Sequence, residues 1–107
     1  MSVPVRIHPE AKQELRQALE WYKAIDPSLA SRMRRQVDLA VRGVRRFPLA
    51  GAPIFDSYRH VVPRHFPYML VYRVLSSGTR TTAAEVLAVF HLRRDPDWME
   101  RQLGARA

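Results

Sequence analysis

FPYMLVYRV at residues 66–74 and LAVFHLRRDPDW at residues 87–98 are the two stretches that decide the fold. Almost every residue in 68–75 and in 83–91 is apolar, which is typical of strands that are covered on both faces. Between them, the polar and glycine-containing SSGTRT at residues 76–81 predicts the turn of a hairpin. SYRHVV at residues 57–62 predicts a further strand just before them. The second half of the chain is therefore expected to form three consecutive strands.

The first half of the chain predicts one short strand and two amphipathic helices. Valine and isoleucine alternate with other residues at residues 3–8, which favours a strand. Apolar residues then recur with helical spacing over residues 10–24. A second helix is expected to begin with Asp26 as its cap and Pro27 in its first turn, and to end near FPLAG at residues 47–51. Two such helices joined by a short turn form a helical hairpin.

The expected fold is α+β, with the order strand-helix-helix-strand-strand-strand. Asp95 and Pro96 repeat the helix-start pattern and predict a short C-terminal helical tail. The helical hairpin is expected to pack on a mostly antiparallel four-stranded sheet. A chain of 107 residues is the right size for one hydrophobic core, so we expect a single domain over residues 1–107.

The charge balance of the chain is strongly basic, with a formal net charge of +8. All of the cations except Lys12 and Lys23 are arginine. The planar guanidinium pairs with carboxylate or phosphate through two hydrogen bonds, so this bias favours an acidic partner. A general replacement of lysine by arginine explains the same composition equally well.

Several classes of function are excluded or disfavoured by what the sequence contains. There is no cysteine, the four histidines fall in different expected elements, and Asp95 and Asp97 are explained more simply by helix capping, so no metal site or other cofactor is expected. No G-x-S-x-G motif and no glycine-rich phosphate loop is present. The apolar runs at residues 68–72 and 86–90 are too short to span a bilayer, and no signal peptide is recognised. A cytoplasmic domain without a membrane segment is expected.

Metal-free cleavage of RNA remains compatible with the residues present. It requires a general base, for which His91 is the candidate, and cations that hold the scissile phosphate. The candidate cations are Arg59, Arg64, Arg73, Arg93 and Arg94. Tyr68, Tyr72 or Trp98 would stack on a base. The aromatic residues and His91 also have structural explanations. These are core packing for Tyr68 and Tyr72, closure of the tail helix onto the sheet for Trp98, and a backbone partner at a strand end for His91.

The chain resembles the RelE/ParE superfamily, the toxins of type II toxin–antitoxin modules. The likeness runs from VRIHPEAKQELRQALEWY at residues 5–22, through residues 66–74, to AVFHLRRDPDWMERQ at residues 88–102. The resemblance implies one of two activities: RelE-like members cleave messenger RNA in the ribosomal A site, and ParE-like members inhibit DNA gyrase. RelE-like nucleases carry an arginine where this chain has Met69 and a tail tyrosine where it has Trp98. These departures favour the ParE-like branch, without catalysis.

The resemblance also implies partners and contact residues. A cognate antitoxin is expected to form a hetero-oligomer with the chain and to contact Leu15, Leu19, Tyr22 and Val37. The residues expected to contact the target are Arg59, Arg64, Arg73, Arg93, Arg94 and Trp98. The alternative is a ribosome-dependent mRNA endonuclease that uses His91 with Arg59, Arg64, Arg73, Arg93 and Arg94. A third class, a nucleic-acid-binding module without toxicity, is consistent with the net charge alone.

Overall fold

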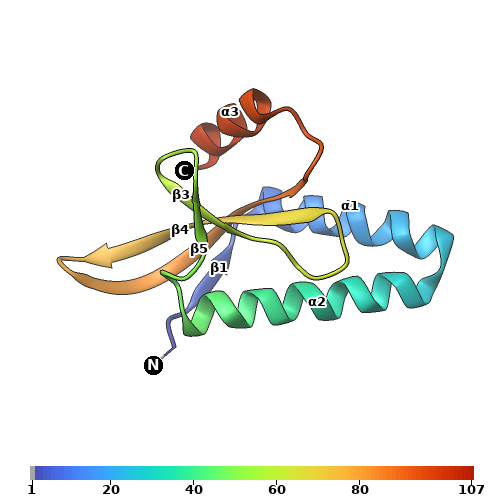
Figure 1. Ribbon diagram of the computed structural model, residues 1–107, viewed down its shortest axis with the longest axis horizontal. Helices are drawn as coiled ribbons and strands as arrows, with labels where there is room; N and C mark the ends of the chain where they lie inside the picture. The colour runs from blue at the N-terminus through green and yellow to red at the C-terminus, as the bar shows by residue number, and fades with distance from the viewer. Residues whose placement is uncertain (1) are drawn as a thin grey trace.

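The computed structural model describes residues 2–107 and places helices on both faces of one twisted sheet (Figure 1). Two helices joined end to end cover one face, and the C-terminal helix lies on the other (Figure 1). In chain order the elements are β1 (Val5–Ile7), α1 (Pro9–Ile25), α2 (Pro27–Arg46), β2 (Ala52–Ile54), β3 (Tyr58–Val61), β4 (Tyr68–Ser77), β5 (Arg80–His91) and α3 (Pro96–Arg106). The predicted α+β class and helical hairpin are confirmed.

Each of the three helices starts in the same way, with a capping side chain followed by proline. The Asp26 carboxylate accepts a hydrogen bond from the Ser28 backbone N–H at 2.9 Å, and Asp95 caps α3 in the same manner. The hydrogen bond from the Ser28 N–H lowers the pKa of Asp26 below its ordinary value. His8 caps α1 through its Nδ1 atom, a role that the sequence analysis did not assign to it. Local capping chemistry therefore fixes where all three helices begin.

The sheet has five strands in the order β1-β5-β4-β3-β2, so the expectation of four was wrong. The additional strand, β2, pairs antiparallel with β3. Its proline and glycine neighbours resemble a loop in sequence, but Pro53 is tolerated because β2 is an edge strand. Within residues 2–107, only β1 runs parallel to its neighbour, β5, and the remaining strand pairs are antiparallel.

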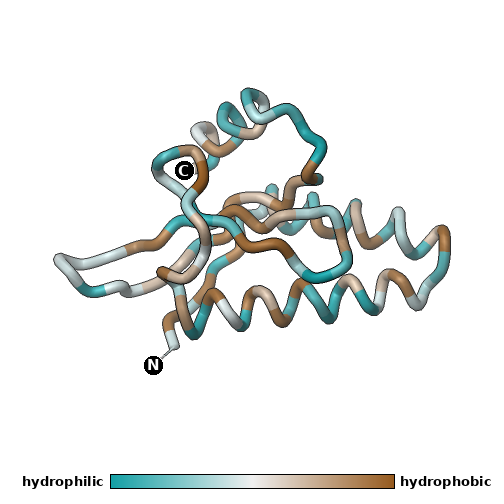
Figure 2. Tube along the Cα trace, viewed as in Figure 1, coloured by the Kyte–Doolittle hydropathy of each residue, from teal (hydrophilic) through white to brown (hydrophobic). Residues whose placement is uncertain are grey.

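The two faces of the sheet carry separate hydrophobic clusters. Along β4, Leu70 and Tyr72 belong to the cluster under α1 and α2, whereas Met69 and Val71 belong to the cluster under α3. This confirms the prediction that β4 and β5 are covered on both faces. On α2 the tube colour alternates between brown and teal, as expected of a helix with one apolar and one arginine-rich face (Figure 2).

Candidate functional site

An open groove of about 550 Å³ lies between α1, the adjoining ends of β4 and β5, and the start of α3. We call it the aromatic groove, because five aromatic side chains line it together with one histidine, two arginines and one glutamate. These residues are Trp21, Tyr22, Tyr68, Phe90, Trp98, His91, Arg93, Arg94 and Glu14. Four of the residues predicted from the sequence, His91, Arg93, Arg94 and Trp98, therefore lie together.

His91 is held in a defined orientation at the end of β5. It pairs across the sheet with Tyr68, and the two rings meet edge to face with their centroids 5.1 Å apart. Its Nδ1 atom accepts a hydrogen bond from the Arg93 backbone N–H at 3.0 Å. In the neutral ring the proton is then on Nε2, so neither ring nitrogen has a free lone pair. A neutral His91 in this arrangement is not poised to act as a general base.

Two arginines and a tryptophan follow β5 and form one wall of the groove. The Arg94 guanidinium lies over the Trp98 ring, with its central carbon 4.4 Å from the ring centroid, as in a cation–π pair. Trp98 also packs against Phe90 beneath it, with ring centroids 5.3 Å apart. Arg93 and Arg94 are both exposed at the surface of the groove. The groove can therefore offer cations and apolar rings to the same partner.

The other three arginines predicted as target contacts lie outside the aromatic groove. Arg59 donates to the carbonyl oxygens of Leu49 and Gly51, at 3.0 and 2.9 Å, and so fixes the segment that leads into β2. Arg73 pairs with Glu85 on β5, with Nη2 2.8 Å from Oε1. Arg64 is exposed in the loop between β3 and β4. Of the residues proposed for a nuclease, His91, Arg93 and Arg94 lie together in the groove, whereas Arg59, Arg64 and Arg73 do not line it.

Two further positions from the sequence analysis are buried. Tyr72 has no exposed surface, and its hydroxyl donates to the Pro48 carbonyl at 2.8 Å and accepts from the Gly51 N–H at 3.1 Å. Burial raises the pKa of Tyr72 and of Tyr68. Met69 is 6% exposed in the cluster under α3. Tyr72 is therefore a core residue, and only Tyr68 of the two tyrosines lines the aromatic groove.

The residues expected to contact an antitoxin divide into two groups. Leu15, Leu19 and Tyr22 are half-buried along α1, where they pack against the core but retain exposed surface. Val37 is 3% exposed and lies inside the cluster between α2 and the sheet. The Val37 side chain is therefore inaccessible to a partner in this conformation, and its place is in the core.

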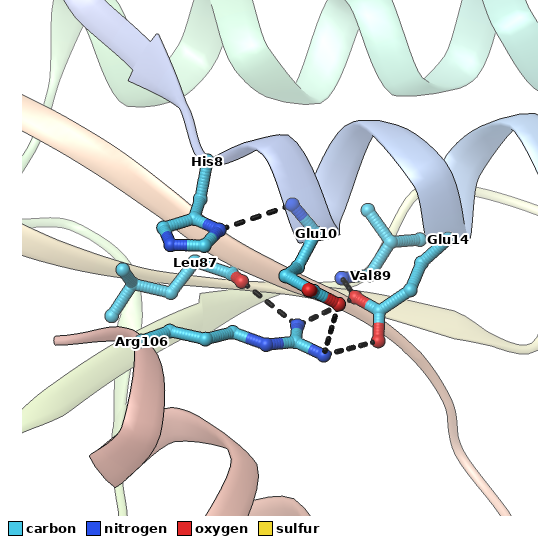
Figure 3. A network of polar contacts seen from close by, with 6 residues as sticks. All are labelled: His8, Glu10, Glu14, Leu87, Val89 and Arg106. Atoms are coloured by element: carbon cyan, nitrogen blue, oxygen red, sulfur yellow. Dashed lines mark hydrogen bonds and ion pairs between the residues drawn. The ribbon is translucent and has the colours of Figure 1, made fainter.

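One end of the aromatic groove is braced by a polar network that the sequence analysis missed (Figure 3). The Arg106 guanidinium, from α3, forms two hydrogen bonds with the Glu14 carboxylate, at 2.8 and 2.9 Å, and one with the Leu87 carbonyl at 3.0 Å. Glu14 in turn accepts from the Val89 N–H at 3.0 Å. The short β1 pairs with β5 only as far as Val86, so the Leu87 carbonyl and the Val89 N–H lie on the part of the β5 edge that no strand covers. We call the Arg106–Glu14 pair the edge clip, because it forms hydrogen bonds with the backbone groups of this edge and joins α3 to α1.

Trp21 is the other groove residue that the sequence analysis missed. It is 61% exposed and meets Tyr22 edge to face, with ring centroids 5.1 Å apart. A large aromatic residue outside the apolar stripe of α1 is a signal that could have identified it. Within residues 2–107, no helix has both the length and the apolar character needed to cross a membrane. In the same range, no three His, Asp or Glu side chains come together as metal ligands would.

The chain is similar to known toxins in sequence and in structure. The model of the family described as ParE toxin of type II toxin-antitoxin system, parDE, matches residues 5–96. Two curated relatives, each named Toxin ParE2 and from the CDC 1551 and H37Rv strains of Mycobacterium tuberculosis, are 30% identical over 107 residues, covering 99% of this chain and 97% of theirs. A solved structure titled Chromosomal ParDE TA system from P. aeruginosa superposes with a TM-score of 0.71 at 14% identity, covering 86% of this chain and 98% of that one, which shows the same fold. Since the family model spans most of its length, this chain belongs to the ParE toxin family of type II toxin–antitoxin systems.

Proposed function

We propose that the chain inhibits growth by inhibiting DNA gyrase, and that a cognate antitoxin neutralises it by binding it as a hetero-oligomer in the cytoplasm. The observation that supports this proposal is that some of the arginines line the groove and others are bound by groups of the chain itself. Arg93 and Arg94 border the aromatic groove beside Trp98, whereas Arg59 and Arg73 are engaged by backbone carbonyls and by Glu85. The groove offers rigid aromatic rings and two exposed arginines, a composition suited to binding a protein partner, and three of the five candidate cations for phosphate cleavage do not line it.

The target contact in this proposal is made by the wall of the groove that follows β5. Trp98 is half-buried against Phe90 and so is held rigidly, while Arg94 stacks above it. A rigid aromatic ring beside an arginine is the composition that dominates binding energy at protein interfaces. Arg64 contributes to the positive field around this wall rather than to the contact itself, and the charge of Arg73 is offset by Glu85.

A paired assay on the purified chain, free of antitoxin, tests the proposal. One arm measures gyrase supercoiling of plasmid DNA, and the other measures messenger cleavage on programmed ribosomes. We expect inhibition of supercoiling with intact messenger. Messenger cleavage that disappears in His91→Ala, with normal supercoiling, would instead establish the ribosome-dependent endonuclease.

Charge reversal locates the contact. The double variant Arg93→Glu/Arg94→Glu is expected to raise the concentration needed for gyrase inhibition about tenfold or more, because it places negative charge beside Trp98. Arg42→Glu/Arg45→Glu is the matched control, since it makes the same change of charge on the exposed face of α2, away from the groove. Equal loss in the two variants would mean that inhibition depends on overall charge and not on the groove.

A further inference from the structure

A second pocket, of about 310 Å³, lies between the end of α1, the first turns of α2 and the loop before β4. We call it the arginine-rimmed pocket. Its apolar members, Tyr22, Leu29 and Phe66, are buried or half-buried and form the floor. Its charged and titratable members, Arg32, Arg35 and His65, are exposed and form the rim. In Figure 1 the loop that leads into β4 extends toward α2.

The floor of this pocket is held in place by the loop's backbone and by ring packing. His65 adopts a left-handed backbone conformation, with φ 71°, which is uncommon for a residue other than glycine. The turn continues with a hydrogen bond of 2.8 Å from the Tyr68 N–H to the Phe66 carbonyl. The Phe66 ring then meets the Tyr22 ring edge to face, with centroids 5.2 Å apart. The apolar floor is therefore formed before any partner binds, which lowers the entropic cost of binding.

The rim carries positive charge that no ion pair within residues 2–107 neutralises. Of the residues that line the pocket, which all lie within 2–107, none is acidic. Neither Arg32 nor Arg35 forms an ion pair within the described residues, although their neighbour Arg34 pairs with Asp38. Two guanidinium groups above an apolar floor complement a carboxylate-bearing segment that carries one apolar side chain.

We propose that the arginine-rimmed pocket is a docking site for an acidic peptide segment, in which one large apolar side chain enters the pocket and flanking Asp or Glu residues pair with Arg32 and Arg35. The inference rests on the proposed function, because the segment is assigned to the antitoxin. A nucleic acid fits less well: it would pair with the arginines, but Tyr22 and Phe66 pack edge to face and offer no open stacking platform to a base.

The position of this pocket links antitoxin binding to the aromatic groove. Tyr22 lines both cavities, and its ring contacts Phe66 on one side and Trp21 on the other. An acidic segment anchored beside Phe66 would therefore lie next to Tyr22, which also borders the aromatic groove. From there, a continuing chain would reach the groove that we assign to the target.

The test uses the full-length chain and two kinds of ligand. The first is the cognate antitoxin, and the second is a synthetic peptide with one phenylalanine between aspartate and glutamate residues. Arg32→Glu/Arg35→Glu is expected to raise the Kd for the antitoxin at least about tenfold, since it replaces two attractions by two repulsions. The control Arg42→Glu/Arg45→Glu, with the same charge change farther along α2, is expected to change the Kd less than about threefold.

The peptide shows where the large apolar side chain binds. In amide NMR spectra it is expected to shift the signals of Arg32, His65 and Phe66, and replacement of its phenylalanine by alanine is expected to remove these shifts. An oligothymidylate of equal charge that shifts the same signals more strongly than the peptide would overturn the proposal in favour of a nucleic acid. Unchanged antitoxin affinity in Arg32→Glu/Arg35→Glu would overturn it as well.

The failure of this inference can be told apart from failure of the proposed function. If the unaltered chain inhibits gyrase but Arg32→Glu/Arg35→Glu binds antitoxin normally, the docking-site proposal fails and gyrase remains the target. If the unaltered chain does not inhibit gyrase but Arg32→Glu/Arg35→Glu loses antitoxin binding, the gyrase proposal fails and the docking site is supported.

Discussion

Replacing Arg106 by methionine is expected to lower the free energy of unfolding by about 2–3 kcal/mol, through loss of the edge clip (Figure 3). The Arg106 side chain is only 6% exposed, and Glu14 is 17% exposed. Methionine keeps an unbranched apolar stem and removes the guanidinium, whose central carbon lies 5.5 Å from the centroid of the Phe90 ring. The variant therefore isolates the polar contribution of the clip from its packing.

The magnitude follows from the groups that the variant leaves behind. Removing one partner of a buried ion pair costs about 3–5 kcal/mol when the other charge stays buried and unpaired. Here the cost is smaller, because Glu14 retains its hydrogen bond from the Val89 N–H and some contact with solvent. The Leu87 carbonyl loses its side-chain donor at the open edge of β5, which adds about 1 kcal/mol or more.

A double-mutant cycle with Glu14→Gln separates the pair from its neighbours. Glutamine keeps an oxygen for the Val89 N–H but removes the charge, so Arg106 retains only the exposed Glu10, at 3.8 Å, as an acidic partner. We expect a coupling energy of about 1 kcal/mol or more, measured by urea unfolding followed with far-UV circular dichroism. The stability loss from Arg106→Met corresponds to a fall in Tm of roughly 8 °C or more.

The exposed pair on α2 provides the control for this experiment. Arg34 and Asp38 lie 3.5 Å apart, and each side chain is 60% exposed, so Arg34→Met is expected to cost less than about 0.5 kcal/mol. If Arg106→Met lowers the free energy of unfolding no more than Arg34→Met does, the edge clip contributes no more than a solvent-exposed ion pair. The reasoning that assigns it a role in holding α3 would then be refuted.

Other predictions concern single positions in the fold. Gly51→Ala is expected to lower the free energy of unfolding by about 2 kcal/mol, because a Cβ there would overlap the Tyr72 hydroxyl, whereas Gly43→Ala, with open space around it in α2, is expected to raise Tm slightly. Tyr72→Phe removes the donor to the Pro48 carbonyl and is expected to cost about 1–2 kcal/mol in urea unfolding. The Ser28 N–H lowers the pKa of Asp26 in the folded chain, so its contribution to stability is present above the ordinary value of 3.8 and is lost as the pH falls through the lower folded value. Asp26→Asn is therefore expected to flatten the pH dependence of unfolding in that range, and an unchanged slope would contradict the assignment.

The sequence predicted those parts of the structure that depend on neighbouring residues. Helix starts at Asp26 and Asp95 were predictable because capping acts over two or three residues. His91, Arg93 and Trp98 lie within eight positions of one another, around the end of β5 and the start of α3, so their gathering in one groove followed from the chain itself. In these places local preference and tertiary structure agree.

The features that were missed depend on contacts between distant parts of the chain. The edge clip joins Glu14 to Arg106, 92 residues later, and no local pattern reports such a pair. The strand β2 exists because β3 offers it an edge, although its own sequence resembles a loop. The burial of Val37 likewise depends on which turn of α2 meets the sheet. Alternation alone could not show which face of β4 would be covered by α3.

That alternation in β4 bears directly on the choice between cleavage and binding. Side chains at odd positions of its first half point to the α3 side, so Met69 lies under α3 while Tyr68 borders the aromatic groove. Position 69 is where the RelE-like nucleases are expected to carry a catalytic arginine, but in this chain Met99 and Leu103 of α3 pack in the same cluster as Met69. A charge there would be buried, with the edge clip holding α3 above it. Met69 and α3 therefore pack together, and the α3 side of β4 is part of the core in this chain.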